Sequence, residues 1–479
     1  MFSALKDVGR LLKIVISLVS YGILPYTSFF AYFRFRSKTY GQRICMLLQS
    51  LGPTFIKLGQ SLASRPDIVG SEVAENLLLL CDKMPSFPFS DVVKIVESEL
   101  HKKIHEVFSE FSEMPVSAAS ISQVHKARTL DGEWKAVKVL RPNIEVEFQK
   151  DINLMRRLER IFGGIAGLTR FKLRELIDTF FRVSKFELDL RFEAANADEL
   201  RKNMRSEEDG FRIPEIDWQH TTRRVLTLQW MDGIPIYRID ELSDRDSIAR
   251  KLVVAFCNQV YRDRYFHADM HPGNLMVDSE NRIVAVDFGI MGRIDEETRF
   301  YISEIFLGFL SKDYEKVADA HYDAGYIPCR REEFATACRA IWEPIADVNA
   351  RDFSMAQLLT HLFKITEDFD MDVQPQLLLL QKTMVLVEGI CRQLSPEVNL
   401  WKIAEVWVKD HYESYGCMDK LRESKVYKCA RNASAFVSKI DKSLDIVIAH
   451  NKKYSEKKNT GFLLYCIILL LIGFIIFKL

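Results

Sequence analysis

Three short segments in the middle of the chain constrain its fold more than any other feature. In order along the chain they are residues 134–139 (WKAVKV), 267–274 (HADMHPGN) and 287–289 (DFG). An apolar strand carrying a lysine, a loop with an acid and an asparagine five residues later, and an Asp-Phe-Gly turn are the parts of a kinase phosphotransfer site. Each part alone is common. The ordered set, with Asp269 and Asp287 eighteen residues apart, predicts an α+β, two-lobed, protein-kinase-like fold.

The residue types in these segments suit phosphoryl transfer. That reaction asks a protein mainly to position the reactants and to neutralise charge. We assign Lys138 to the ATP phosphates and Asp269 to the acceptor. Asn274 and Asp287 are the expected ligands of Mg²⁺, an ion that usually keeps waters and substrate phosphates in its octahedron. The sequence therefore predicts ATP and Mg²⁺ as cofactors.

Two histidines, His267 and His271, flank the predicted catalytic acid. The loop contains no cysteine and has two carboxylates nearby. We interpret both histidines as braces of the loop, with metal ligation as the weaker alternative.

The glycine-rich loop of ordinary kinases is missing before the strand lysine. An alanine- and serine-rich stretch stands in its place. Small residues still let the backbone approach phosphate, but alanine adopts positive φ less readily than glycine, so we expect a stiffer loop with an altered nucleotide preference. The predicted ATP contacts, besides Lys138, are Ser117, Ala118, Ala119, Ser120, Ile121, Ser122, Gln123 and Val124.

A charged segment, residues 187–196, supplies a partner for Lys138. It is predicted to be part of one helix, on which Asp189 and Glu193 are four residues apart and share a face. Two like charges so placed need a cation against them. Glu193 is the preferred partner of the lysine and Glu187 the second choice.

Several motifs together resemble the UbiB/ABC1/ADCK atypical kinase-like family. They are the alanine-rich loop, the HADMHPGN segment, and an upstream KLGQ (residues 57–60) followed by SRPD (64–67). Within the family, the DVQPQ segment at 372–376 and the leucine-rich run to Gly389 are similar to its bacterial ubiquinone-biosynthesis branch. The resemblance covers about residues 40–410 and the chain's tail.

The resemblance implies a regulatory element formed by Lys57, Gln60, Glu187 and Asp189. Lys57 and Gln60 would share one helix face, opposite the acidic pair Glu187 and Asp189. A lysine in that place would occupy the groove where ordinary kinases bind protein substrates. Nucleotide binding and hydrolysis would remain, whereas transfer to proteins would be disfavoured.

Hydrophobic periodicity gives the order of domains. Residues 40–112 are predicted to be helical, 123–129 and 133–140 to form a hairpin, about 145–203 to be a long helical region, and 212–214 with 225–230 to complete the small-lobe sheet. The predicted domains are a membrane-associated segment 1–36, a helical extension 37–115, a small lobe 116–231, a large lobe 232–410, a helical stalk 411–459 and a transmembrane helix 460–479.

Apolar segments flanked by basic residues at both ends of the chain indicate membrane association. Residues 461–477 carry no charge and follow four lysines, which predicts a short spanning helix with the globular part on the cytoplasmic side. Residues 1–36 combine an apolar segment with aromatics and basic residues, and predict an amphipathic helix on anionic lipid. The alternative is a helix packed on the protein's own surface.

Composition narrows the partners and the compartment. Lys+Arg and Asp+Glu both number 66, so no basic excess favours nucleic acid. Nine cysteines without a CxxC pair suit a reducing compartment and argue against zinc as a cofactor. By resemblance, the chain is a bacterial inner-membrane kinase or ATPase supporting ubiquinone biosynthesis, with ubiquinone precursors and other biosynthetic proteins as partners. The alternatives are a kinase for a small molecule or protein, and a nucleotide-binding scaffold without activity.

Overall fold

The computed structural model describes most of the first 415 residues. Two units are distinguished, Met1–Gly416 and Cys417–Leu479, and the second lies outside the described residues. The described residues are 2–23, 35, 38–63, 69–78, 80, 84–162, 173–204, 210–327, 331–346, 369 and 374–415.

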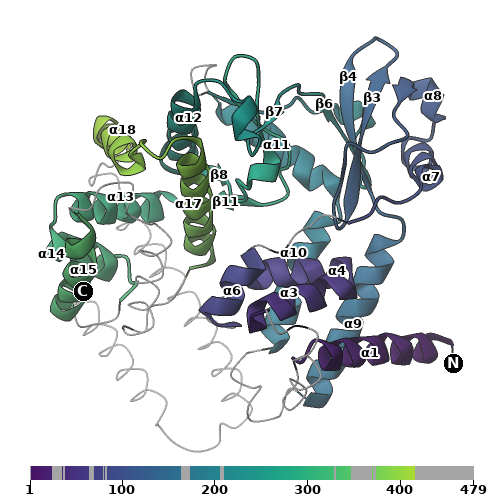
Figure 1. Cartoon of the computed structure of the whole chain (residues 1–479), viewed down its shortest axis with the longest axis horizontal. Helices are drawn as coiled ribbons and strands as arrows, with labels where there is room; N and C mark the ends of the chain where they lie inside the picture. The colour runs from purple at the N-terminus through teal and green to yellow at the C-terminus, as the bar shows by residue number, and fades with distance from the viewer. Residues whose placement is uncertain are drawn as a thin grey trace, which may run out of the picture. The chain divides into compact units, whose positions relative to one another are not determined.

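The small lobe is an antiparallel sheet with strand order β1-β3-β4-β6 and with β2 paired to β3 (Figure 1). Its strands are β1 (Phe108–Phe111), β2 (Ser117–Ala118), β3 (Ser122–Thr129), β4 (Trp134–Leu140) and β6 (Val225–Gln229). The predicted hairpin is confirmed as β3–β4, in which Val124 pairs with Lys138. Its turn contains Gly132 at φ 88°, a conformation that glycine adopts without the steric cost of a side chain.

Alternation along β4 decides which of its side chains reach the site. Val137 and Val139 are fully buried, in one cluster with Val92 and Val96 of α7 (Phe89–Leu100). Helix α7 therefore packs on the face of the sheet that these valines share, with α8 (Ile104–Val107) nearby (Figure 1). Successive side chains of a strand point to opposite faces, so Lys138 points away from α7.

Three helices replace the long helical region expected at about 145–203. They are α9 (Ile144–Phe162), α10 (Leu173–Glu187) and α11 (Leu190–Asn203). The prediction of one helix through 187–196 is wrong, because Asp189 has extended backbone and caps α11 by accepting a hydrogen bond from Arg191 N. Aspartate is favoured at such a cap, where it satisfies an otherwise unpaired backbone donor.

The large lobe contains two small sheets. One has the order β5-β10-β9-β7 and the other pairs β11 with β8. The strands are β5 (Phe211–Arg212), β7 (Ile234–Pro235), β8 (Tyr265–His267), β9 (Leu275–Val277), β10 (Ile283–Ala285) and β11 (Met291–Arg293). The expectation that residues near 212 complete the small-lobe sheet is wrong, because β5 pairs in parallel with β10. A two-residue strand has no periodicity of its own to show which sheet it joins.

Helices form the rest of the large lobe. They are α12 (Arg245–Cys257), α13 (Glu296–Leu310), α14 (Tyr314–Asp323), α15 (Arg331–Ala346), α17 (Pro375–Leu394) and α18 (Leu400–Tyr415). A π-helical turn, Asn258–Arg262, follows α12 and leads into β8. One large core joins α11, α12, α17, α18 and strands β8 to β10, and its fully buried members include Phe266 and Phe288. The strands carrying the catalytic-loop and DFG motifs are therefore held from several sides.

The N-terminal extension is a helical cluster of α1 (Phe2–Ser20), α3 (Tyr40–Leu51), α4 (Pro53–Ala63) and α6 (Ser71–Leu78) (Figure 1). Gly59 of the KLGQ motif allows α4 to approach its neighbours, because a Cβ there would lie 2.7 Å from Leu48 Cδ1 and 2.6 Å from Leu80 Cδ2. Helix α1 packs against α3 and α9: Arg10 donates to the Leu51 carbonyl of α3 at 2.9 Å and to Asp151 of α9 at 2.8 and 2.7 Å. The opposite side of α1 exposes Leu12 and Ile16, each 57% accessible.

The membrane part of the predicted fold class requires correction. Among the described helices, none combines the length and the apolar composition that a bilayer crossing needs. The described fold is thus two-lobed and kinase-like with N-terminal helices, and a transmembrane helix is not part of it. The residues given that role, 460–479, and all of the expected stalk after Tyr415 lie outside the described residues.

Candidate active site

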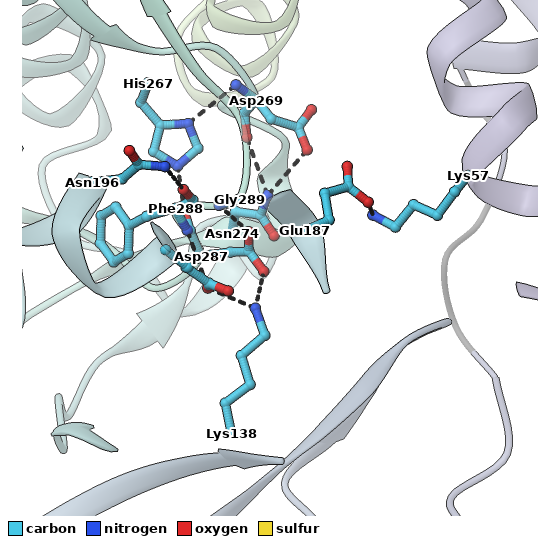
Figure 2. Close-up of polar contacts among 11 residues, drawn as sticks. Lys57, Lys138, Glu187, Asn196, His267, Asp269, Asn274, Asp287, Phe288 and Gly289 are labelled. Carbon is cyan, nitrogen blue, oxygen red and sulfur yellow. Dashed lines mark hydrogen bonds and ion pairs between the residues drawn. The ribbon is translucent and has the colours of Figure 1, made fainter. Parts of the chain in front are cut away.

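Lys138 is the centre of the site. Its Nζ lies 2.6 Å from Glu193 Oε1 on α11. It lies 2.7 Å from Asp287 Oδ2 of the DFG turn (Figure 2). The structure thus pairs the lysine with Glu193, and not with Glu187. Glu193 Oε1 also accepts a long hydrogen bond from Phe288 N at 3.4 Å. One buried ammonium therefore ties the small-lobe sheet, α11 and the DFG turn together.

The electrostatics of this cluster favour a charged lysine and a charged aspartate. Burial alone would lower the pKa of Lys138, but Asp287 and Glu193 raise it above its usual range. Burial alone would raise the pKa of Asp287, but Lys138, the Gly289 backbone N–H and Lys57 hold it below its usual range. Burial and the nearby Asp287 charge raise the pKa of Glu193, against the opposing effect of Lys138. Of the two carboxyl groups beside Lys138, that of Asp287 therefore stays ionised more readily than that of Glu193.

His267 connects the catalytic loop to the DFG turn. Its ring Nε2 lies 2.6 Å from the Asp287 carbonyl oxygen, and Asp269 N–H donates to its Nδ1 at 3.1 Å (Figure 2). A carbonyl can only accept and a backbone N–H can only donate, so the ring is neutral with its proton on Nε2. Burial lowers the pKa of His267, which favours that neutral form. The geometry is that of a brace between the two motifs.

The remaining loop residues hold one another. Asn274 Nδ2 donates to the Asp269 carbonyl at 3.1 Å and more weakly to Asp269 Oδ2 at 3.4 Å. Val286 N–H donates to the Asn274 carbonyl at 3.0 Å, which places Asn274 beside the DFG turn. His271 caps the short turn Pro272–Asn274 by accepting from Gly273 N–H.

The donor set of this site fits Mg²⁺. One ammonium, Lys138, faces two carboxyl groups, so the cluster has carboxylate in excess. Asp287 is about 40% exposed at its side chain and remains accessible to an ion. The Asn274 amide nitrogen is held by Asp269, so its oxygen is the end that a cation would meet. A carboxylate and an amide oxygen are ligands that Mg²⁺ accepts together with phosphate and water.

The regulatory residues are brought together only in part. Lys57 Nζ of α4 lies 3.4 Å from Glu187 Oε2 at the end of α10, and each side chain is 13% exposed (Figure 2). Gln60 lies on the same helix as Lys57. Asp189 does not face Lys57 as expected. It binds Arg191 at 2.7 Å, and the Arg191 hydrogen bond lowers the pKa of Asp189.

The alanine-rich loop is a tight turn between β2 and β3. Ala119 N–H donates to the Ser122 carbonyl, and Arg141 donates to the Ala119 carbonyl at 2.7 Å. The side chain of Gln123 accepts a hydrogen bond from Phe87 N–H and is 1% exposed. The turn ends at Ser122, which pairs with Leu140 at the end of β4, two residues beyond Lys138. Buried members of the predicted ATP contacts are Ser120, Ile121, Ser122 and Gln123.

Two residues of the site were missed by the sequence analysis. Lys382 of α17 donates to Asp269 Oδ1 at 2.7 Å. Asn196 of α11 donates to the Phe288 carbonyl at 3.0 Å and accepts from the Tyr265 hydroxyl. No local motif marks Lys382, which lies in a leucine-rich helix 113 residues from its partner. Asn196 lies within the charged segment that the sequence analysis singled out, three residues after Glu193.

Comparison with known families agrees with this geometry. A model of the ABC1 atypical kinase-like domain matches residues 79–321, which is just over half of the chain. The chain belongs to the ABC1 atypical kinase-like family. A second model, the UbiB helical domain, matches residues 338–399. Together the two matches confirm the UbiB/ABC1 membership that the motifs predicted, and they make the chain an atypical kinase-like protein.

Two solved structures are similar to this ABC1-family chain. The complex of Rv3197 with erythromycin from Mycobacterium tuberculosis has 26% sequence identity and a TM-score of 0.53, and the match covers 73% of this chain and 89% of that one. The Rio2 kinase–ADP/Mg²⁺–phosphoaspartate complex from Chaetomium thermophilum has 12% identity and a TM-score of 0.26, with 80% and 99% covered. The second likeness is too low to carry an argument.

Proposed function

We propose that this protein binds Mg-ATP where its two lobes meet and acts as an atypical kinase or ATPase that supports ubiquinone biosynthesis. The observation that carries the proposal is Lys138, bonded at once to Glu193 and Asp287. That arrangement is the one in which a kinase lysine and metal-binding aspartate are both in place. The ubiquinone role is supported by the match to the UbiB helical domain.

Each residue has one task in the proposed reaction. Lys138 binds an ATP phosphate, and Asn274 and Asp287 hold Mg²⁺. When bound, that ion neutralises charge on the phosphate oxygens. An acceptor oxygen forms a bond to the γ-phosphorus while the bond from that phosphorus to the bridging oxygen breaks, and its electron pair leaves with ADP. Asp269 takes the proton of the acceptor hydroxyl or water.

Hydrolysis is favoured over transfer to a protein by the Lys57–Glu187 ion pair. The pair places α4 beside the site, and Lys57 also contributes to lowering the pKa of Asp287. A helix in that place would obstruct a protein substrate. Kinase activity on a small molecule remains the second candidate, because a small acceptor would need less room.

ATP turnover by the purified full chain tests the proposal. Phosphate release is measured with and without vesicles containing an anionic lipid and with a phenolic headgroup of a quinone precursor. We expect Mg-dependent release that both additions increase. Activity that appears only with an added protein would favour the protein-kinase alternative, and no Mg-ATP binding or turnover under any condition would favour a scaffold.

We also propose that the exposed side of α1 rests on anionic lipid, which would keep the protein at the cytoplasmic face of a bacterial inner membrane. The support is its apolar stripe, Leu12, Val15 and Ile16, with Lys13 beside it. Replacing Leu12 and Ile16 by Gln should reduce co-flotation with anionic vesicles. Leu130→Gln, at an apolar residue of the small lobe that is 62% exposed, is the control. Unchanged flotation of the α1 variant would contradict this placement.

A further inference from the structure

Lys382 is bonded to the residue assigned as catalytic acid–base. Its Nζ lies 2.7 Å from Asp269 Oδ1, and the two side chains are 20% and 29% exposed. The other carboxylate oxygen, Oδ2, lies 3.4 Å from Asn274 Nδ2. One oxygen of Asp269 is therefore held by a strong, charge-assisted hydrogen bond, and the other has only a weak contact.

The catalytic loop does not supply a cation of its own. Its sequence, HADMHPGN, contains neither lysine nor arginine. Lys138 is bonded to Glu193 and Asp287, and Lys57 pairs with Glu187. Within the described part of the chain, Lys382 is the cation that contacts the Asp269 carboxylate.

The helix that carries Lys382 is firmly seated. Val387, Ile390 and Leu394 of α17 belong to the main core, and Cys391 Sγ lies 3.6 Å from the Ala249 carbonyl of α12. Thr383, next to the lysine, is fully buried and donates to the Leu379 carbonyl. The packed helix fixes the backbone from which Lys382 extends, and the bond to Asp269 Oδ1 holds its ammonium. A group held in this way can orient its partner without a large entropic cost at the moment of reaction.

Helix α17 lies outside the segment matched by the kinase-like domain and inside the segment matched by the helical domain. We propose that Lys382 is a positioning residue, through which the helical domain orients Asp269 for proton transfer. Lys382 fixes Oδ1, so that Oδ2 receives the proton of the acceptor. The lysine itself neither gains nor loses a proton. This inference rests on the proposed function, because it assumes that Asp269 accepts that proton.

Kinetics of full-chain variants test the inference. Lys382→Met should lower kcat for ATP turnover by about 10- to 100-fold, the range expected when a catalytic group loses its orientation, and should leave KM for Mg-ATP within twofold. Lys382→Arg, which keeps a cation, should recover most of the rate. Arg392→Met is the matched control, because it removes from the same helix a cation that pairs with Glu388.

A double variant separates positioning from a merely structural role. If Lys382 acts through Asp269, Lys382→Met should cost less than about twofold when added to Asp269→Asn, since the two residues then act as a unit. Suppose that the wild type turns over ATP. An unchanged kcat in Lys382→Met, or a loss from Lys382→Met that adds fully to the loss from Asp269→Asn, would then overturn this inference and leave the proposed function standing. Absence of turnover in the wild type would overturn the proposed function and this inference together.

Discussion

At the scale of single residues, the site depends on one buried lysine between two carboxyl groups. The side chains of Lys138 and Glu193 are 9% and 8% exposed. Charges so deeply buried stabilise a fold only as partners, and the loss of one leaves the other without compensation. The Lys138–Glu193 pair is therefore expected to contribute to stability as well as to the proposed ATP site.

Replacement of the lysine should expose this dependence. Lys138→Met is expected to lower the free energy of unfolding by about 3 kcal/mol, because Glu193 would be left buried without its cation. Adding Glu193→Gln should recover part of that loss. Urea unfolding of the wild type, the single variant and the double variant measures both effects. Wild-type stability in Lys138→Met would show that the pair is not buried as described.

Asp287 offers a test of the metal assignment. Asp287→Asn should reduce the thermal stabilisation by Mg-ATP, measured against each protein's own nucleotide-free midpoint, because the variant loses an anionic ligand of the ion. Asp319→Asn is the matched control, since Asp319 has 43% side-chain exposure against 40% for Asp287 and also pairs with a basic residue, Arg331. Equal Mg-ATP stabilisation in Asp287→Asn and wild type would remove Asp287 from the metal site.

Most elements could be predicted because their signals are local. The β3–β4 hairpin follows from alternating residues around Asp131-Gly132, and α3 and α4 from helical spacing. The failures have a physical cause as well. The break between α10 and α11 occurs because Asp189 adopts an extended conformation and caps α11 instead of continuing α10. Strand β5 joins the large lobe because it pairs with β10, which is distant in the sequence.

The contact between α4 and α10 leads to a prediction about nucleotide preference. If Lys57 influences the site through its pair with Glu187, Lys57→Ala and Glu187→Gln should change the ratio of ATP to ADP affinity in the same direction. About fivefold is expected for an ion pair worth about 1 kcal/mol. Lys185→Ala, an exposed lysine of α10, is the control. Opposite effects of the two variants, or none, would show that α4 does not act through this pair.

Helix α14 should make stability depend on pH. Burial lowers the pKa of His321 from 6.5 to about 4, and its Nδ1 lies 2.7 Å from the Val317 carbonyl. The native state binds this proton less readily than the unfolded state, so the stability present above pH 6.5 is lost as the pH falls toward 4. His321→Gln should be less sensitive over that range. The test is to measure the urea midpoint of wild type and of His321→Gln at pH 7.5 and 5.0. An equal fall of the midpoint in both proteins would contradict the assignment to His321.

At the scale of the whole molecule, the site is assembled from five distant segments. They carry Lys138, Glu193, the loop with Asp269, the DFG turn and Lys382. The motif residues could be predicted, because each lies in a segment with its own recognisable pattern. Lys382 could not, since its position depends on how α17 packs against α12 and β11. The sequence motifs place the site in the kinase-like domain alone, whereas the structure shows that Lys382 of the helical domain also contacts it.

The most direct test of the account separates ATP binding from chemistry in one variant. Mg-ATP affinity and the rate of phosphate release are measured on full-length wild type and Asp269→Asn. We predict that release falls by about 100-fold, the typical contribution of a positioned acid–base group. The affinity should stay within twofold, because Asp269 contacts neither Lys138 nor Asp287 and Asn274 keeps its bond to the main-chain carbonyl of residue 269. An unchanged rate in Asp269→Asn, with a wild type that hydrolyses ATP, would contradict the account.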